Sequence, residues 1–376
     1  MTFTYMDQQD DFDKLCSTLN GEDQLAVDTE FVRRTTYYPI LALLQIASKD
    51  GIYLIDPHGI TNWSGLLDIF RSDTRIVMHS CSEDLEVFRK TFDQLPENLF
   101  DTQIAAAYLG KGDSLGYAAL VALMRNQEID KSETQSDWSQ RPLSESQLAY
   151  AAEDVRWLLG IASELSEELV QCGRQDWVTE EINALNRKYE FEASPEVSWL
   201  RLKGVNRLNE SSWPLAQALC DWRETTARRK DKPKSWIAKD AELLEIIQRQ
   251  PQNQTDLSRL SGISPPLVRH HGSKILEFVA SGQHLPAPSQ APAPQLTASE
   301  RKLLKSMQSV VSDYSESQGL AARFVANKQE LSQYILFHHD RSTIRSSLDE
   351  GWRKEQLASN YRRCYEHRFS DDLCSL

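Results

Sequence analysis

The chain has 376 residues, of which 40% are hydrophobic and 26% are charged, and its net charge is −13 at pH 7. This length predicts two or three domains and a core large enough to fold without disulfide or metal staples. No apolar run reaches the roughly 18–20 residues that cross a bilayer, and the acidic residues 1–13 carry the wrong charge for a secretion or transit signal. We therefore expect a cytoplasmic protein without membrane contact.

The charge is distributed unevenly along the chain. The net charge is −19 over residues 1–199, +5 over residues 200–290 and +1 over residues 291–376. An acidic metal site beside a polyanion-binding module would give such a gradient, although ordinary solvated surface explains charge alone more simply. The six cysteines form no Cys-x-x-Cys pair, which argues against a zinc ribbon, a redox motif or a disulfide framework.

The first half of the chain alternates short apolar runs with helical periodicity. The runs predict five strands, over residues 25–31, 41–47, 52–56, 75–79 and 98–101. The first three follow one another too closely for parallel crossovers, so they should be antiparallel neighbours. Helical patterns over residues 83–92 and 102–109 follow the last two strands directly. The sequence thus predicts a mixed five-stranded sheet with helices on its faces.

From about residue 144 the spacing of apolar residues is helical, and it first predicts helices over residues 147–168 and 175–191. Residues 193–195 form a plausible hinge. Residues 285–294 hold four prolines and no charge, which is typical of a semi-rigid linker. We therefore predict four segments: an α/β domain over residues 1–195, a helical domain over 208–284, a linker over 285–296 and a second helical domain over 297–376.

Two carboxylates stand near the end of the first predicted strand, Asp28 and Glu30. Residues i and i+2 of a strand point to the same face, so both acids share one side of a chain segment otherwise built for burial. Burying a carboxylate is costly unless it is paired or binds a cation. The pair therefore suggests a metal site, although a solvated strand end is the favoured explanation when this motif is taken alone.

Two further acidic signals follow. Ser80 and Glu83 have capping-box spacing at the start of a helix, which places Asp84 in the first turn, where the helix dipole alone could explain it. Tyr150 and Asp154 are four residues apart on a later helix, so they lie on one face and can act on one site. A solvent-facing stripe is the alternative for this pair.

Together these residues resemble the DEDDy exonucleases of the ribonuclease H-like family, whose tyrosine corresponds to Tyr150. The surrounding segments 25–31, 79–85, 100–103 and 137–143 look like the ribonuclease D branch of that family. Residues 211–281, with Trp213-Pro214-Leu215, Trp222-Arg223 and Arg228-Arg229, look like an HRDC domain. The resemblance covers about the first 280 residues. Beyond the linker it rests on position and helical pattern, and it implies two all-α HRDC-like domains after the α/β domain.

The resemblance implies a 3′→5′ exoribonuclease that releases nucleoside 5′-monophosphates while trimming precursor tRNA and other small structured RNAs. Two divalent ions, Mg²⁺ or Mn²⁺, would stabilise the charge on the attacking water and the leaving oxygen. Asp28, Glu30, Asp84 and Asp154 would be their ligands, with Asp28 the best candidate to bridge them. Tyr150 would orient the water, because a phenol with a pKa near 10 is a poor base. We expect a monomer.

Other residues are weaker candidates. Asp101 could support the site or simply cap a helix, and Gln45 could face the site, but its neutral side chain indicates no particular role. Two other functions stay open: a catalytically inactive RNA-binding scaffold with a nuclease fold, and a DNA-directed exonuclease of the proofreading type. The residues that could contact RNA are Trp138, Arg141, Tyr37, Tyr38, Arg228, Arg229 and Lys230.

Overall fold

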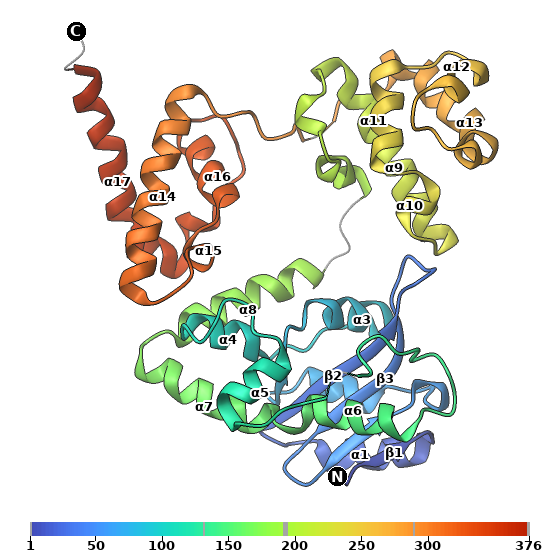
Figure 1. Cartoon of the computed structure of the whole chain (residues 1–376), viewed down its shortest axis with the longest axis vertical. Helices are drawn as coiled ribbons and strands as arrows, with labels where there is room; N and C mark the ends of the chain where they lie inside the picture. The colour runs from blue at the N-terminus through green and yellow to red at the C-terminus, as the bar shows by residue number, and fades with distance from the viewer. Residues whose placement is uncertain (1, 131, 191–194, 289, 374–376) are drawn as a thin grey trace. The chain divides into compact units, whose positions relative to one another are not determined.

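The computed structural model describes residues 2–130, 132–190, 195–288 and 290–373. The chain forms two compact units (Figure 1). The first comprises Met1–Val32, Pro39–Phe191 and Leu296–Leu376, and the second comprises Arg33–Tyr38 and Glu192–Gln295. Among the described helices, none is both long and apolar enough to span a membrane.

The first unit is built around a mixed sheet of six strands in the order β1-β4-β3-β2-β5-β6. The predicted antiparallel arrangement of β2, β3 and β4 is confirmed, and β5 and β6 continue the sheet in parallel from β2. The sixth strand, β1, pairs in parallel with β4 at the sheet edge; its three residues are too short to show an alternating pattern. The strands are β1 (Thr4–Met6), β2 (Gln24–Val32), β3 (Ile40–Ala47), β4 (Ile52–Ile55), β5 (Arg75–Met78) and β6 (Leu99–Asp101).

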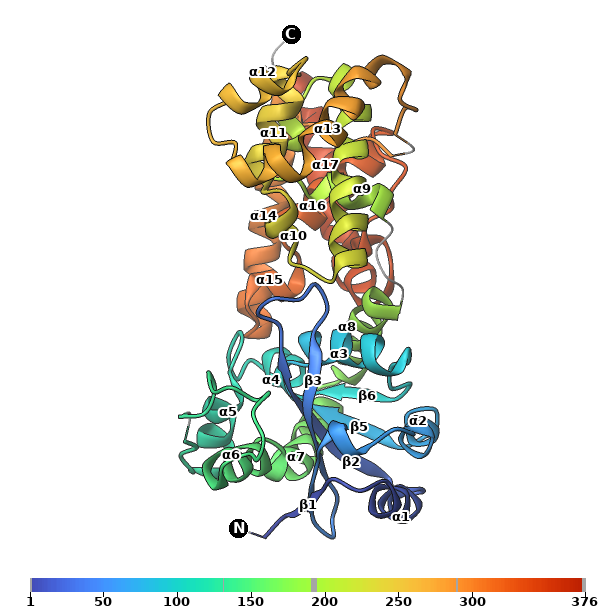
Figure 2. The same cartoon turned by 90° about the vertical axis from the view of Figure 1, so that its right-hand side faces the viewer.

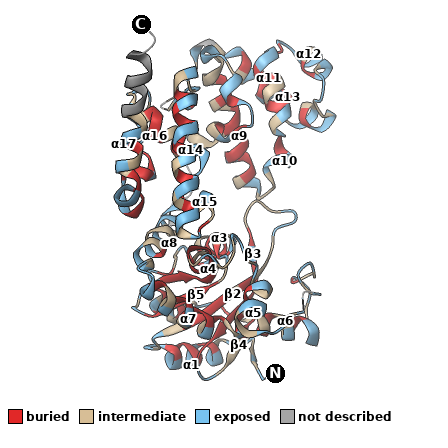
Figure 3. Ribbon diagram, turned by 60° about the vertical axis from the view of Figure 1, so that its left-hand side comes forward, coloured by how far each residue is buried: buried red, intermediate tan, exposed pale blue. Residues whose placement is uncertain are grey.

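Helices cover both faces of this sheet, with α6 on one side and α1 and α2 on the other (Figure 2). Buried residues follow the strands and the inward sides of the helices (Figure 3). Between α6 and the sheet, the buried residues include Leu43 and Leu54 of the strands and Ala151 of α6. The helices are α1 (Gln9–Leu19), α2 (Ser64–Phe70), α3 (Ser82–Phe92), α4 (Thr102–Tyr108), α5 (Tyr117–Arg125), α6 (Glu145–Arg156), α7 (Leu158–Gln171) and α8 (Gln175–Glu190).

The single helix predicted over residues 147–168 is two helices, α6 and α7, separated at Trp157. The Tyr117 hydroxyl donates to the backbone oxygen of Glu153 at 2.9 Å and accepts from the backbone N–H of Trp157 at 3.2 Å. In a continuous helix the N–H of Trp157 would donate to the oxygen of Glu153. The Tyr117 hydroxyl is inserted between these two groups, and such an insertion is a known cause of helix breaks.

The C-terminal helices belong to the first unit and share its hydrophobic core. Trp352 stacks on Trp177 of α8 with 4.3 Å between ring centroids. Arg353 pairs with Glu181 and donates to the Tyr108 hydroxyl at 3.2 Å. The described residues of the predicted segment, 297–373, thus form helices joined by loops, as expected, while the boundaries of a separate domain over 297–376 stay a prediction. The helices are α14 (Ala298–Gln318), α15 (Ala322–Val325), α16 (Lys328–His338) and α17 (Gly351–Leu373).

The second unit is helical, with a core that includes Trp199, Leu219, Ile246 and Ile275. The described residues of segment 285–296 form no helix or strand, in keeping with the predicted linker. Most of the predicted hinge, residues 193 and 194, lies outside the described residues. The helices are α9 (Trp213–Lys230), α10 (Lys234–Ile237), α11 (Asp240–Arg249), α12 (Gln254–Arg259) and α13 (Pro265–Ala280).

Candidate active site

The first unit brings the four predicted carboxyl groups together. Asp28 and Glu30 lie on β2, Asp84 lies in the first turn of α3, and Asp154 lies on α6. Helix α6 packs on β2, β3 and β4, so its acid faces the strand that carries the first two. Burial raises the pKa of Asp28, and the charges of Asp84, Asp154 and Glu30 raise it further. The four groups therefore interact electrostatically as one cluster.

The start of α3 differs from the sequence prediction. Helix α3 begins after Cys81 without a side-chain cap, and Ser80 has a φ of 57°, so the predicted capping box between Ser80 and Glu83 is wrong. Instead the Asp101 carboxylate accepts from the backbone N–H groups of Ser80 at 3.2 Å and Cys81 at 2.9 Å. An acid on a neighbouring strand thus fixes the turn that carries Asp84, and the same acid also caps α4.

Thr29, the residue between the two acids of β2, also belongs to the site. Its hydroxyl donates to Oδ1 of Asp84, which links β2 directly to α3. No sequence pattern predicts a role for this residue, because the intervening position of an Asp-x-Glu motif points away from the face that the acids share. Its one available signal was a hydroxyl among apolar neighbours on a buried strand.

The electrostatics of the cluster fit a cation site. Burial is the largest cause of the raised pKa of Glu30 (about 9), Asp154 (about 7) and Asp84 (about 6), and neighbouring acids contribute to each. A divalent cation would offset both effects, and carboxylate oxygens are its preferred ligands. Over the residues that the structure describes, no group of three or more His, Cys, Asp or Glu side chains is already arranged to hold a metal ion. The donor chemistry of the four acids nevertheless fits such an ion.

The raised pKa values predict how the stability of the metal-free protein depends on pH. A group whose pKa is higher in the folded than in the unfolded state stabilises the fold at low pH, and this stability is lost as the pH rises through the folded value. With EDTA present, we expect Tm to fall by several degrees between about pH 5 and about pH 9. Differential scanning fluorimetry should show a shallower fall for Asp154→Asn. If Tm fell equally with pH in the wild-type protein and in Asp154→Asn, the fall could not be assigned to the raised pKa of Asp154.

The predicted water-orienting residue, Tyr150, lies beside this cluster on α6. Its hydroxyl is 3.3 Å from Oγ1 of Thr134. Burial and the nearby Asp154 raise the pKa of Tyr150 to about 12. The phenol therefore keeps its proton at neutral pH and can donate a hydrogen bond, while a role as general base is disfavoured.

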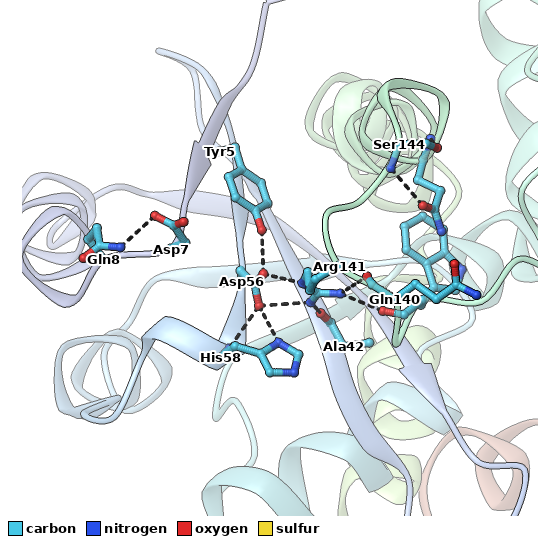
Figure 4. A network of polar contacts seen from close by, with 11 residues as sticks. Tyr5, Asp7, Gln8, Ala42, Asp56, His58, Gln140, Arg141 and Ser144 are labelled. Atoms are coloured by element: carbon cyan, nitrogen blue, oxygen red, sulfur yellow. Dashed lines mark hydrogen bonds and ion pairs between the residues drawn. The ribbon is translucent and has the colours of Figure 1, made fainter.

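The predicted substrate contacts before α6 are engaged within the protein. Trp138 is buried and lies 6.0 Å from the Tyr150 ring. Arg141 pairs with Asp56, Nη2 lying 3.0 Å from Oδ1, and donates to the Ala42 carbonyl at 2.6 Å (Figure 4). Both side chains thus support the scaffold around Tyr150, and their contact with RNA stays a prediction.

The other predicted RNA contacts lie in the second unit. The Tyr37 hydroxyl donates to Glu224 and accepts from Nε of Arg228 at 3.3 Å. Arg228 also forms an ion pair of 3.3 Å with Glu224. The backbone N–H of Tyr38 donates to Asp231 at 3.1 Å. Of the candidates in this unit, the two that are exposed at the end of α9 are Arg229 and Lys230.

Comparison with known proteins agrees with this arrangement. Residues 3–170 match the 3′-5′ exonuclease family model, and residues 214–279 match the HRDC domain model. Ribonuclease D of Escherichia coli K12 is 34% identical over 366 residues, which cover 95% of this chain and 97% of that protein. Ribonuclease D of Pseudomonas paraeruginosa is 34% identical over 353 residues, which cover 91% and 92%.

The fold is likewise similar to a solved structure. The crystal structure of E. coli RNase D, an exoribonuclease involved in structured RNA processing, superimposes with a TM-score of 0.92 at 32% identity, over 98% of this chain and 99% of that one. Sequence and fold thus agree along nearly the whole chain, including the C-terminal helices. Because relatives at this identity cover the chain almost completely, it belongs to the ribonuclease D family and is a 3′–5′ exoribonuclease.

Proposed function

We propose that this exoribonuclease trims 3′ extensions of precursor tRNA and other small structured RNAs, releasing nucleoside 5′-monophosphates with the help of two divalent cations, Mg²⁺ or Mn²⁺. The observation that carries the proposal is the cluster of four carboxyl groups around Asp28. Burial is the main cause of their raised pKa values, and the charges of other cluster members raise the pKa of Asp28 and Glu30 further. The involvement of E. coli RNase D in structured RNA processing supports the substrate class. We further propose that the enzyme acts in the cytoplasm as a monomer.

We assign a separate role to each residue of the site. Asp28, Glu30, Asp84 and Asp154 would hold the cations, which when bound would stabilise charge on the attacking water and the leaving 3′-oxygen. Tyr150, protonated at neutral pH, would orient that water by a hydrogen bond. Thr29 and Asp101 act indirectly: the first bonds to Asp84 and the second holds the turn before it.

The products test this proposal. The purified enzyme is incubated with a 3′-extended tRNA and with a DNA strand of matched sequence, each with Mg²⁺, Mn²⁺ or EDTA, and the products are separated by chromatography. We expect nucleoside 5′-monophosphates from the RNA extension, little reaction with DNA, and none in EDTA. Equal rates on DNA would contradict the substrate class, and undiminished turnover in EDTA would contradict the cation mechanism.

RNA binding should depend on the basic end of α9. Residues 200–290 carry a net charge of +5, whereas residues 1–199 carry −19 and should repel a polyanion. We expect Arg229→Ala with Lys230→Ala to weaken binding of structured RNA and to flatten its salt dependence by about one counterion per lost phosphate contact. Hydrolysis of a short single-stranded oligonucleotide at saturating concentration should change little.

Fluorescence anisotropy at several salt concentrations measures this effect. The double variant Lys203→Ala with Arg207→Ala removes the same charge from other exposed positions of the second unit and serves as the control. If both double variants weaken binding equally, the effect is one of net charge rather than of the end of α9.

A further inference from the structure

One fully buried polar side chain is unexplained by the fold. Gln45 on β3 has no exposed surface, and neither its Nε2 nor its Oε1 has a hydrogen-bond partner among the described residues. An amide removed from water without a partner is destabilising, so such groups are rare in native proteins and are often found where a ligand, ion or catalytic group completes them. A leucine of similar volume would avoid this cost at an ordinary core position.

The strand register places Gln45 beside the candidate active site. Gln45 is paired with Asp28 of β2 on one side and with Leu54 of β4 on the other. Directly paired residues of antiparallel strands share one face of the sheet. Leu54 packs in the cluster beneath α6 together with Ala151 and Ala152, and α6 is the helix that carries Tyr150 and Asp154. The unpartnered amide therefore lies on the sheet face that carries Asp28, covered by α6.

The burial of Gln45 limits what it can touch. With no exposed surface, the side chain is out of reach of RNA, so any effect on the reaction must pass through a neighbour. Directly paired Cβ atoms are about 4.5–5.5 Å apart, a gap that a glutamine side chain can span. Asp28 is the residue of the carboxyl cluster that is paired with Gln45, which makes it the expected partner.

We propose that Gln45 is a positioning residue that donates a hydrogen bond from Nε2 to the Asp28 carboxylate once that group holds a cation. The role rests on the proposed function, because it concerns one of the proposed metal ligands. Carboxylates that bind metals are usually themselves hydrogen-bonded, and loss of such a supporting bond typically weakens metal affinity or activity about 10–100-fold.

The test compares metal affinity with stability in the full-length chain. In Gln45→Leu the side-chain volume is nearly kept and the amide is removed. We expect Mn²⁺ to bind about 10–100-fold more weakly by isothermal titration calorimetry without RNA, whereas Tm in EDTA should rise by a few degrees because a buried unpaired group is gone. Hydrolysis should recover as the Mn²⁺ concentration is raised, with KM for RNA unchanged at saturating metal.

A matched control separates this role from a purely structural one. Ser315 on α14 also has a buried hydroxyl without a partner among the described residues, so Ser315→Ala should raise Tm while leaving Mn²⁺ affinity unchanged. Gln45→Met, with an unbranched side chain, is measured in parallel in case leucine is not accommodated. Wild-type Mn²⁺ affinity in either Gln45 variant would overturn the role of Gln45 and leave the proposed cation mechanism standing. Failure of the wild-type enzyme to bind Mn²⁺ would overturn the proposed cation mechanism and this role with it.

Discussion

Asp28→Asn should slow RNA hydrolysis at least about a thousand-fold, which corresponds to about 4 kcal/mol of activation barrier. The substitution keeps the size of the side chain and removes one negative charge from the centre of the carboxyl cluster, where Glu30, Asp84 and Asp154 all act on it. The variant should remain folded and bind RNA, because Asp28 belongs to the site rather than to the hydrophobic core. Single-turnover assays with a 3′-extended RNA in Mg²⁺ measure the loss.

Thermal stability gives an independent reading of the same variant. Removing one of several repelling carboxylates should raise Tm in EDTA. It should also reduce the increase in Tm that follows the addition of Mn²⁺. Asp68→Asn, on the exposed side of α2, changes the net charge equally and should leave turnover unaltered. Turnover near the wild-type level in Asp28→Asn would rule out the carboxyl cluster as the catalytic centre.

Tyr150→Phe should reduce the rate by roughly ten- to a thousand-fold, or about 1.4–4 kcal/mol. The phenyl ring keeps its packing beside Trp138 and loses only the hydroxyl that would orient water. RNA affinity should change little, because the hydroxyl acts on the water rather than on the nucleic acid. The rate should also show no ionisation of the tyrosine near neutral pH, since burial raises the pKa of Tyr150 to about 12.

The informative comparison for this variant is between kcat and RNA binding. Tyr53→Phe on β4 removes a hydroxyl elsewhere in the same unit and serves as the control. If Tyr150→Phe weakened RNA binding as much as it slowed turnover, the hydroxyl would be a substrate contact, and a different group would have to orient the water.

Much of the first unit could be predicted because its strands follow simple local rules. The runs that became β2 to β6 are apolar and bounded by turn residues, and the close spacing of the first three required antiparallel pairing. Two carboxylates on one face of a buried strand drew attention to Asp28 and Glu30, whereas Asp84, Tyr150 and Asp154 were assigned to the site by the resemblance to the DEDDy exonucleases. Strand β1 escaped detection because three residues are too few to show a period.

The other features that sequence analysis missed depend on residues distant in the chain. The break at Trp157 comes from Tyr117, 40 positions earlier. The capping rule for Ser80 and Glu83 failed because Asp101, on a neighbouring strand, bonds to the turn instead. Thr29 meets Asp84 across 55 positions. Local patterns predict which elements form, whereas such contacts are set by how the elements pack.

The C-terminal helices have a consequence for how the enzyme is made. The Tyr108 hydroxyl receives a hydrogen bond from Arg353, 245 positions later in the chain, and the apolar residues of α14 to α17 complete the core that begins at Phe12. Ribosomes add about 5–20 residues per second, so the sheet and its acids emerge well before the helices that cover the rest of their core. During that interval the nascent nuclease exposes apolar surface that α14 to α17 later bury. Such non-local contacts slow folding, and the growing chain should therefore be prone to aggregation until α17 has left the ribosome.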